Sequence, residues 1–300
     1  MRKYLFLLPA LLAAACNSGE EFTSSTIEEP CSEIIAYRPA PGQFINDPAS
    51  GFAGVDTPEK ALAYVRKRFD AGSYVSLGSW GGYLTVRFDK PVTATGGYDL
   101  WVAGNQGLNS SEPGIVWVAP DEDGDGEADD GLWYELRGSE WGKAGYVRNY
   151  SVTYTRPADA EAVSWRDSEG RTGTVDYLPQ FHAQPNYYPA WIADNTLTFT
   201  GSLLPANGEQ GIVENTPSWL LKAFEWGYAD NLSTVDAAGQ TNRFRLGDAV
   251  TADGSPARLR QIGLVKVQTG VLGKSPLKDN DIGETSTEVC GIGCYRVVTK

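Results

Sequence analysis

The stretch from Asp121 to Glu135 constrains the fold of this chain more than any other segment. It reads Asp-Glu-Asp-Gly-Asp-Gly-Glu-Ala-Asp-Asp-Gly-Leu-Trp-Tyr-Glu, in which acids alternate with small residues. So many like charges repel one another unless a cation lies among them. Apolar runs at 114–119 and 132–136 flank the acids. The segment therefore predicts a cation-binding loop that joins two strands of an all-β domain.

The spacing of the acids predicts calcium. The first half of the loop matches the pattern D-x-D-x-D-G of EF-hand loops, in which Gly126 permits the sharp turn that lets alternate oxygens converge. The twelfth position is Leu132 instead of the usual glutamate, so Asp130 is expected to replace that ligand. Because strands flank the loop, its expected role is structural, and a solvated acidic turn is the alternative. The predicted metal-binding residues are Asp121, Asp123, Asp125, Glu127, Asp129 and Asp130.

The rest of the chain also favours β structure. It contains 34 Gly, 17 Pro, 9 Trp and 15 Tyr but 1 Met; aromatic residues suit strands, and Gly and Pro mark turns. Polar and apolar residues alternate over 83–89, and further strands are expected at 98–105, 150–155, 196–200 and 262–269. A β-sandwich with long loops fits this pattern best.

One short helix is expected near the start of the domain. Thr57 is a suitable N-cap, and Pro58 occupies the first helical position. Leu62, Val65 and Phe69 recur at helical spacing, which predicts that one face of the helix packs on the core.

Residues 1–15 predict an export signal that precedes a lipid-accepting cysteine. Arg2 and Lys3 form a positive start, and the apolar run over 4–15 is too short to span a bilayer. Three alanines before Cys16 resemble a bacterial lipobox, so Cys16 is the predicted lipidation site; an ordinary signal peptide is the alternative. The acids that follow resemble the surface-export signal of Bacteroidetes lipoproteins, which implies the outer membrane, facing outward.

Beyond the cysteine, residues 16–35 are polar and are expected to form a flexible tether, and 36–300 a single β-sandwich domain. The formal net charge of −13 disfavours nucleic acid as a partner.

A disulfide bond is possible in this chain, because exported proteins fold in an oxidising compartment. Cys290 and Cys294 frame Gly-Ile-Gly and are the predicted pair, with Cys31 bonded to either of them as the alternative.

Two sets of residues are candidates for ligand binding. Tryptophans in glycine-rich or loop segments can stack on sugar rings or planar ligands; these are Trp80, Trp141, Trp191 and Trp226, whereas Trp117 and Trp133 lie in strand patterns and are expected in the core. Asp230 and Asn231, with Asn105 and Glu284 as helpers, predict either a second cation site or a ligand-facing rim, and ordinary Asx turns are the alternative.

No short catalytic motif is present in the sequence. Gly-x-Ser-x-Gly, the phosphate-binding Gly-x-x-x-x-Gly-Lys-Ser/Thr and His-Glu-x-x-His are all missing, and His182 is the one histidine. We therefore expect a binding protein and no catalytic residues. A glycosidase, which needs two carboxylates and leaves no short signature, is the alternative.

An ordered series of motifs runs through most of the chain, over 76–89, 99–105, 111–118, the acidic loop to 136, 187–192, 224–231, 265–270 and 283–289. Together these motifs resemble a family of Bacteroidetes cell-surface lipoproteins. The resemblance implies a jelly-roll, galactose-binding-like sandwich that binds Ca²⁺ and has no known enzyme activity. It also implies a role beside TonB-dependent outer-membrane transporters, some of them for corrinoids, so the predicted function is binding of a nutrient or glycan. A purely structural surface protein is a further alternative.

Overall fold

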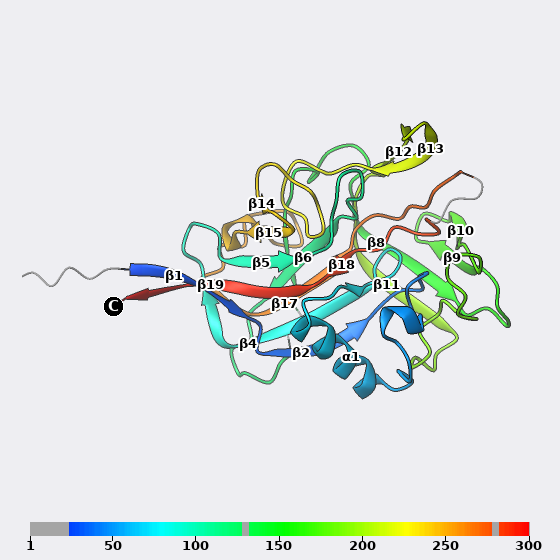
Figure 1. Cartoon of the computed structure of the whole chain (residues 1–300). Coiled ribbons are helices and arrows are strands. Elements are labelled where there is room, and N and C mark those ends of the chain that lie inside the picture. The colour runs from blue at the N-terminus through cyan, green and yellow to red at the C-terminus, as the bar shows by residue number, and fades with distance from the viewer. Residues whose placement is uncertain (1–23, 128–131, 278–281, 300) are drawn as a thin grey trace, which may run out of the picture.

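The computed structural model describes residues 24–127, 132–277 and 282–299 as a mostly β protein (Figure 1). Two antiparallel sheets form a sandwich. The first has the strand order β1 (Ser24–Pro30), β19 (Gly291–Thr299), β5 (Leu100–Ala103), β15 (Thr241–Phe244) and β14 (Ala237–Ala238). The second has the order β16 (Ala249–Val250), β7 (Tyr134–Leu136), β6 (Gly114–Ala119), β17 (Gln261–Thr269), β4 (Tyr83–Thr93) and β2 (Glu33–Arg38).

The connections are those of a jelly roll. Four strands of one sheet, in the order β1-β19-β5-β15, face four strands of the other, in the order β4-β17-β6-β7. The chain passes from one sheet to the other between β4 and β5, between β5 and β6, and again from β15 to β17 to β19. Buried residues of both sheets, such as Val102, Ile292, Val86 and Val265, form one core between them. The predicted jelly-roll sandwich is confirmed.

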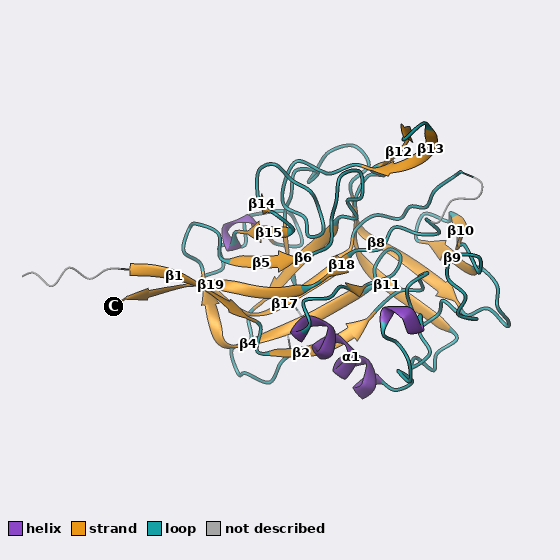
Figure 2. Ribbon diagram, viewed as in Figure 1, coloured by secondary structure: helices purple, strands orange, loops and turns teal. Residues whose placement is uncertain are grey.

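The helix α1 (Pro58–Asp70) begins as its sequence predicts. The Thr57 side chain accepts a hydrogen bond from the backbone N–H of Lys60, at 3.3 Å, which satisfies one of the free donors of the first turn. Ala61, Tyr64 and Val65 are buried in the sandwich core, and α1 packs on β2 (Figure 2). Among the described residues, no helix has the length and apolar character needed to cross a membrane.

A third, smaller sheet, the inserted sheet, is formed by the chain between β7 and β15 and lies beside the sandwich (Figure 1). Its order is β10 (Thr172–Val175), β9 (Val163–Asp167), β8 (Val147–Thr155) and β11 (Thr196–Leu203). It has its own core, rich in tyrosines such as Tyr150, Tyr154 and Tyr188. The remaining elements are the hairpin β12 (Gly208–Val213) and β13 (Thr216–Leu221), the pair β3 (Val75–Ser76) and β18 (Glu288–Val289), and the short 3-10 helices η1 (Pro48–Ser50) and η3 (Leu246–Asp248).

The predicted tether over 16–35 is wrong for its described part. Residues 24–30 form β1, which pairs with β19 from Ser24↔Thr299 to Pro30↔Gly293, and β2 begins at Glu33. Residues 25–28 are exposed, so backbone hydrogen bonds hold this strand instead of buried side chains. Because the strand buries no apolar face, its polar sequence has no hydrophobic pattern that would predict β1. Cys16 and the predicted signal segment lie outside the described residues.

The predicted disulfide between Cys290 and Cys294 is also wrong. The Gly-Ile-Gly segment between them continues β19 and pairs with β5. The extended run from Gly291 to Cys294 alone spans about 10 Å, whereas bridged Cα atoms lie roughly 4–7 Å apart. Cys31, Cys290 and Cys294 are all free, and burial raises the pKa of each thiol to about 11.

Candidate functional site

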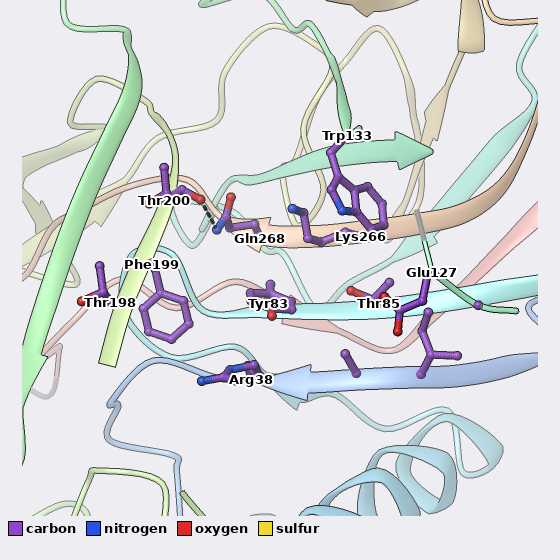
Figure 3. A pocket seen from close by; sticks show the side chains of 13 residues that line it. Arg38, Tyr83, Thr85, Glu127, Trp133, Thr198, Phe199, Thr200, Lys266 and Gln268 are labelled. Carbon is purple, nitrogen blue, oxygen red and sulfur yellow. Dashed lines mark hydrogen bonds between the residues drawn. The ribbon is translucent and has the colours of Figure 1, made fainter. Parts of the chain in front are cut away.

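An open groove of about 410 Å³ lies on the face of the second sheet that points away from the sandwich core (Figure 3). Side chains alternate across a strand, so Val265 and Val267 of β17 enter the core while Lys266 and Gln268 face the groove. Strand β11 of the inserted sheet forms a further wall. The described lining residues are Ile35, Ala36, Arg38, Tyr83, Thr85, Gly126, Glu127, Trp133, Thr198, Phe199, Thr200, Lys266 and Gln268.

Lys266 is surrounded by aromatic rings in this groove. Its Nζ lies 4.6 Å from the ring centre of Trp133, 5.1 Å from that of Trp117 and 5.7 Å from that of Tyr83. Figure 3 shows its side chain beside Trp133. Burial lowers the pKa of Lys266 to about 8, which leaves most of the amines protonated at neutral pH. Among the described residues, no carboxylate forms an ion pair with it, so the aromatic faces are its main electrostatic partners.

The other end of the groove is held firmly in place. Gln268 donates from Nε2 to the carbonyls of Gly81, at 2.9 Å, and Thr200, at 3.2 Å, which ties β17 to β11. The ring of Phe199 on β11 meets Tyr83 edge-on, with centroids 6.2 Å apart. Hydrogen bonds from Gln268 and the contact between Tyr83 and Phe199 therefore hold this end of the groove in place.

The acidic loop forms one edge of the groove. Carboxylate oxygens of Asp121, Asp123 and Asp125 lie within 4.8 Å of one another, as the spacing predicts. Gly126 has a φ of 88°, a left-handed conformation that favours glycine. Next to this turn, Gly126 and Glu127 line the groove. The predicted ligands Asp129 and Asp130 lie outside the described residues.

Two of the predicted stacking tryptophans belong to cores instead. Trp80 is fully buried, donates from Nε1 to the carbonyl of Ser202, and meets Tyr150 edge-on in the core of the inserted sheet. Trp191 is buried and stacks on Tyr37 with centroids 5.7 Å apart. The prediction is wrong for both, because loops that look exposed in sequence are covered by the inserted sheet and by α1.

Trp141 and Trp226 are half-buried, but neither lines the groove. Trp141 packs against Tyr146 and the guanidinium of Arg148. Trp226 lies in a narrow crevice beside Asp236. By contrast, Trp133, expected in the core, is half-buried and lines the groove. Trp133 lies just before β7, which begins at Tyr134, and the sequence does not show which side of this segment remains open.

Asp230 and Asn231 do not form a ligand-facing rim, because they are 1% and 0% exposed. Asn231 hydrogen-bonds the backbone N–H and carbonyl of Phe224. The carboxylate of Asp230 joins those of Glu112 and Glu288 in a second group of acids, with oxygens within 4.8 Å of one another. Glu284 stays outside this group and accepts a hydrogen bond from the backbone N–H of Gln43.

A scan against protein-family models and a search among curated proteins each found no match to this chain.

A buried acid on β7 gives the protein a testable pH dependence. Glu135 accepts hydrogen bonds from Tyr146 and Ser202, yet burial outweighs them and raises its pKa from 4.5 to about 7. Because the pKa of Glu135 is higher in the folded state than in the unfolded state, its contribution to the free energy of unfolding is complete below about pH 4.5. This contribution is lost as the pH rises through about 7. We expect Glu135→Gln to remove this loss, on the order of 3 kcal/mol at 1.4 kcal/mol per pKa unit.

The measurement is urea unfolding of the wild type and Glu135→Gln at a series of pH values from about 5 to about 8. Other buried acids titrate equally in both proteins, so the difference between the two curves isolates Glu135. Parallel curves would show that the carboxyl of Glu135 does not titrate in this range.

Proposed function

We propose that this chain is a surface-exposed, calcium-stabilised lipoprotein that binds a glycan or a sugar-bearing nutrient in the groove beside β17. The observation that carries the proposal is an open groove on a rigid sheet, lined by aromatic rings together with hydrogen-bonding and charged side chains. Its volume of about 410 Å³ is within the range of small-molecule sites.

The lining matches the chemistry of a sugar. One face of a sugar ring carries C–H groups that pack on aromatic rings, which Trp133, Tyr83 and Phe199 supply. Sugar hydroxyls need donors and acceptors around the edge, and Arg38 and Thr85 are placed there. Lys266 adds a cation without an acid partner among the described residues, which favours ligands that carry a carboxylate or phosphate.

A binding role is favoured over glycoside hydrolysis. Glycosidases place two carboxyl groups roughly 5–10 Å apart around the scissile bond. Among the described lining residues, Glu127 is the one carboxylate. The groove therefore lacks the second acid in the part of the chain that the structure describes, while its aromatic lining suits binding without turnover.

We expect Trp133→Ala to weaken ligand binding by about tenfold or more, because removal of one buried aromatic contact costs at least 1.4 kcal/mol at a binding hot spot. The measurement is isothermal titration with a panel of neutral glycans, acidic glycans and corrinoids. Trp141→Ala is the matched control, since Trp141 is also half-buried but lies outside the groove.

Equal losses in both variants, or none in Trp133→Ala, would refute the groove as the binding site. Release of a shortened glycan during the titration would favour the hydrolase instead. If no member of the panel binds the wild type, a structural surface protein becomes the better interpretation.

The acidic loop is proposed to hold Ca²⁺ at the edge of the groove. Three converging carboxylates supply the hard oxygen ligands that Ca²⁺ prefers. Arg87 on β4 donates to the carbonyl of Gly124, at 2.7 Å, and so joins the loop to the sheet. An ion in the loop would fix the position of Glu127, which lines the groove.

We expect chelation to lower the melting temperature, because an ion bound only by the folded state adds about 2.7 kcal/mol when present at 100 times its dissociation constant. Asp123→Asn should reduce the shift measured by calorimetry. Glu122→Gln is the control, since Glu122 belongs to the same loop but not to the converging set. A chelation shift that is equal in both variants would contradict a calcium site in this loop.

The location proposed for the protein is the outer membrane, anchored by lipid at Cys16 and facing outward beside a TonB-dependent transporter. A lipid on this cysteine would hold the protein at the membrane without a spanning segment. We expect Cys16→Ala to move the protein from the membrane fraction to the soluble fraction, as measured by immunoblot of fractionated cells. Retention of the variant in the membrane fraction would exclude lipid at Cys16 as the anchor.

A further inference from the structure

A second group of acids lies inside the molecule, and none of its members lines the groove. It consists of Glu112, just before β6, Asp230, in the connection from β13 to β14, and Glu288, on β18. Their carboxylate oxygens lie within 4.8 Å of one another. Asp230 and Glu288 are 1% and 3% exposed, whereas Glu112 is partly exposed and gives the group a route to solvent.

The backbone holds these carboxylates in place. The N–H of Ser286 donates to Glu112 Oε1 at 2.9 Å, and the N–H of Glu288 donates to Asp230 Oδ2 at 2.9 Å. The N–H of Asn105 donates to Asp230 Oδ1 at 3.2 Å. Among the described residues, no Lys or Arg forms an ion pair with any of the three acids. The group is therefore positioned but not neutralised by protein cations.

An independent observation comes from Gln106, a neutral side chain that is 2% exposed. Its Nε2 donates to Asn242 Oδ1 at 3.0 Å, and the Asn242 amide is itself oriented by donation to the carbonyl of Asn231 at 2.7 Å. This chain of bonds sets which end of the Gln106 amide carries oxygen. Its Oε1 is buried and has no hydrogen-bond partner.

The free oxygen of Gln106 borders the same space as Asp230, one of the three acids. A Cβ placed on Gly104 would lie 2.6 Å from Gln106 Oε1 and 2.8 Å from Asp230 Oδ1, so both oxygens border one small volume beside that glycine. Glu288 Oε1 is also buried without a hydrogen-bond partner. These two acceptors have neither a donor nor a cation beside them, and leaving a buried acceptor in that state is costly.

We propose that Glu112, Asp230 and Glu288, together with Oε1 of Gln106, bind a buried Ca²⁺. Carboxylate and amide oxygens are the ligands that this ion prefers. Three adjacent carboxylates, of which Asp230 and Glu288 are buried, repel one another strongly unless a cation lies among them. A soft metal fits less well, because the nearby thiol of Cys290 donates a hydrogen bond to the carbonyl of Gly104 instead of facing the site as a thiolate ligand.

This site is separate from the acidic loop. Glu112 precedes β6 and Asp121 follows it, so the two groups lie at opposite ends of a strand about 20 Å long. The buried ion joins segments that are distant in sequence: the chain after β5, the start of β6, the connection after β13, and β18. It therefore stabilises the end of the sandwich opposite the loop, and it does not depend on the proposed function of the groove.

The test is calcium binding by equilibrium dialysis with ⁴⁵Ca²⁺, using the full chain with Asp123→Asn to disable the loop. We expect this variant to retain one equivalent of bound Ca²⁺. Adding Glu288→Gln should weaken that binding by at least about tenfold, because even changes outside the direct ligands of a metal cost that much. Glu284→Gln is the matched control, since Glu284 is equally buried in the same segment but outside the group.

The proposal is overturned if the Asp123→Asn protein binds no Ca²⁺, or if Glu288→Gln leaves its binding unchanged. In either case a proton shared between Glu112 and Glu288 would account for the group. Should Glu288→Gln fail to fold, crystals of the wild type soaked in MnCl₂ decide the question. Anomalous density among Glu112, Asp230 and Glu288 supports the site, and its absence there refutes it.

Discussion

The structure depends on the pairing of β17 with both β4 and β6 at the centre of the larger sheet. This strand is hydrogen-bonded to a neighbour on each edge, and its two faces have different surroundings. Val265 and Val267 enter the core between the two sheets, while Lys266 and Gln268 face the groove. The two-residue period of a strand thus sets the core and the candidate binding site from the same nine residues. A shift in register by one residue would exchange them.

The inserted sheet turns this open face into a site. Without β11, the side chains of β2, β4 and β17 would lie on a flat surface; with it, Phe199 and Thr200 add a wall, and Gln268 ties the two sheets together. The same insertion buries Trp80. Packing of the inserted sheet therefore covers Trp80, which the sequence predicted to be available for stacking. Trp133, which was expected in the core, lines the groove instead.

The chain has two groups of converging acids, one formed by residues close in sequence and one by residues from distant segments. Asp121, Asp123 and Asp125 converge because alternate residues in a tight glycine-containing turn point the same way, so their grouping could be predicted from spacing alone. Glu112, Asp230 and Glu288 converge only because three distant segments meet at one end of the sandwich. Asp230, a candidate for a cation site in the sequence, joins this second group, whereas its predicted partners Asn231 and Glu284 bond to backbone instead.

The sequence by itself determined what is decided within a few residues: the N-cap and buried face of α1, the turn of the acidic loop, and most of the strands. These follow from local hydrogen bonds and side-chain periodicity. Only the tertiary structure decided that exposed β1 pairs with β19, that Cys290 and Cys294 stay apart along one strand, and which face of each strand is covered. Those outcomes depend on contacts between residues far apart in the chain, and such contacts leave no local pattern to read.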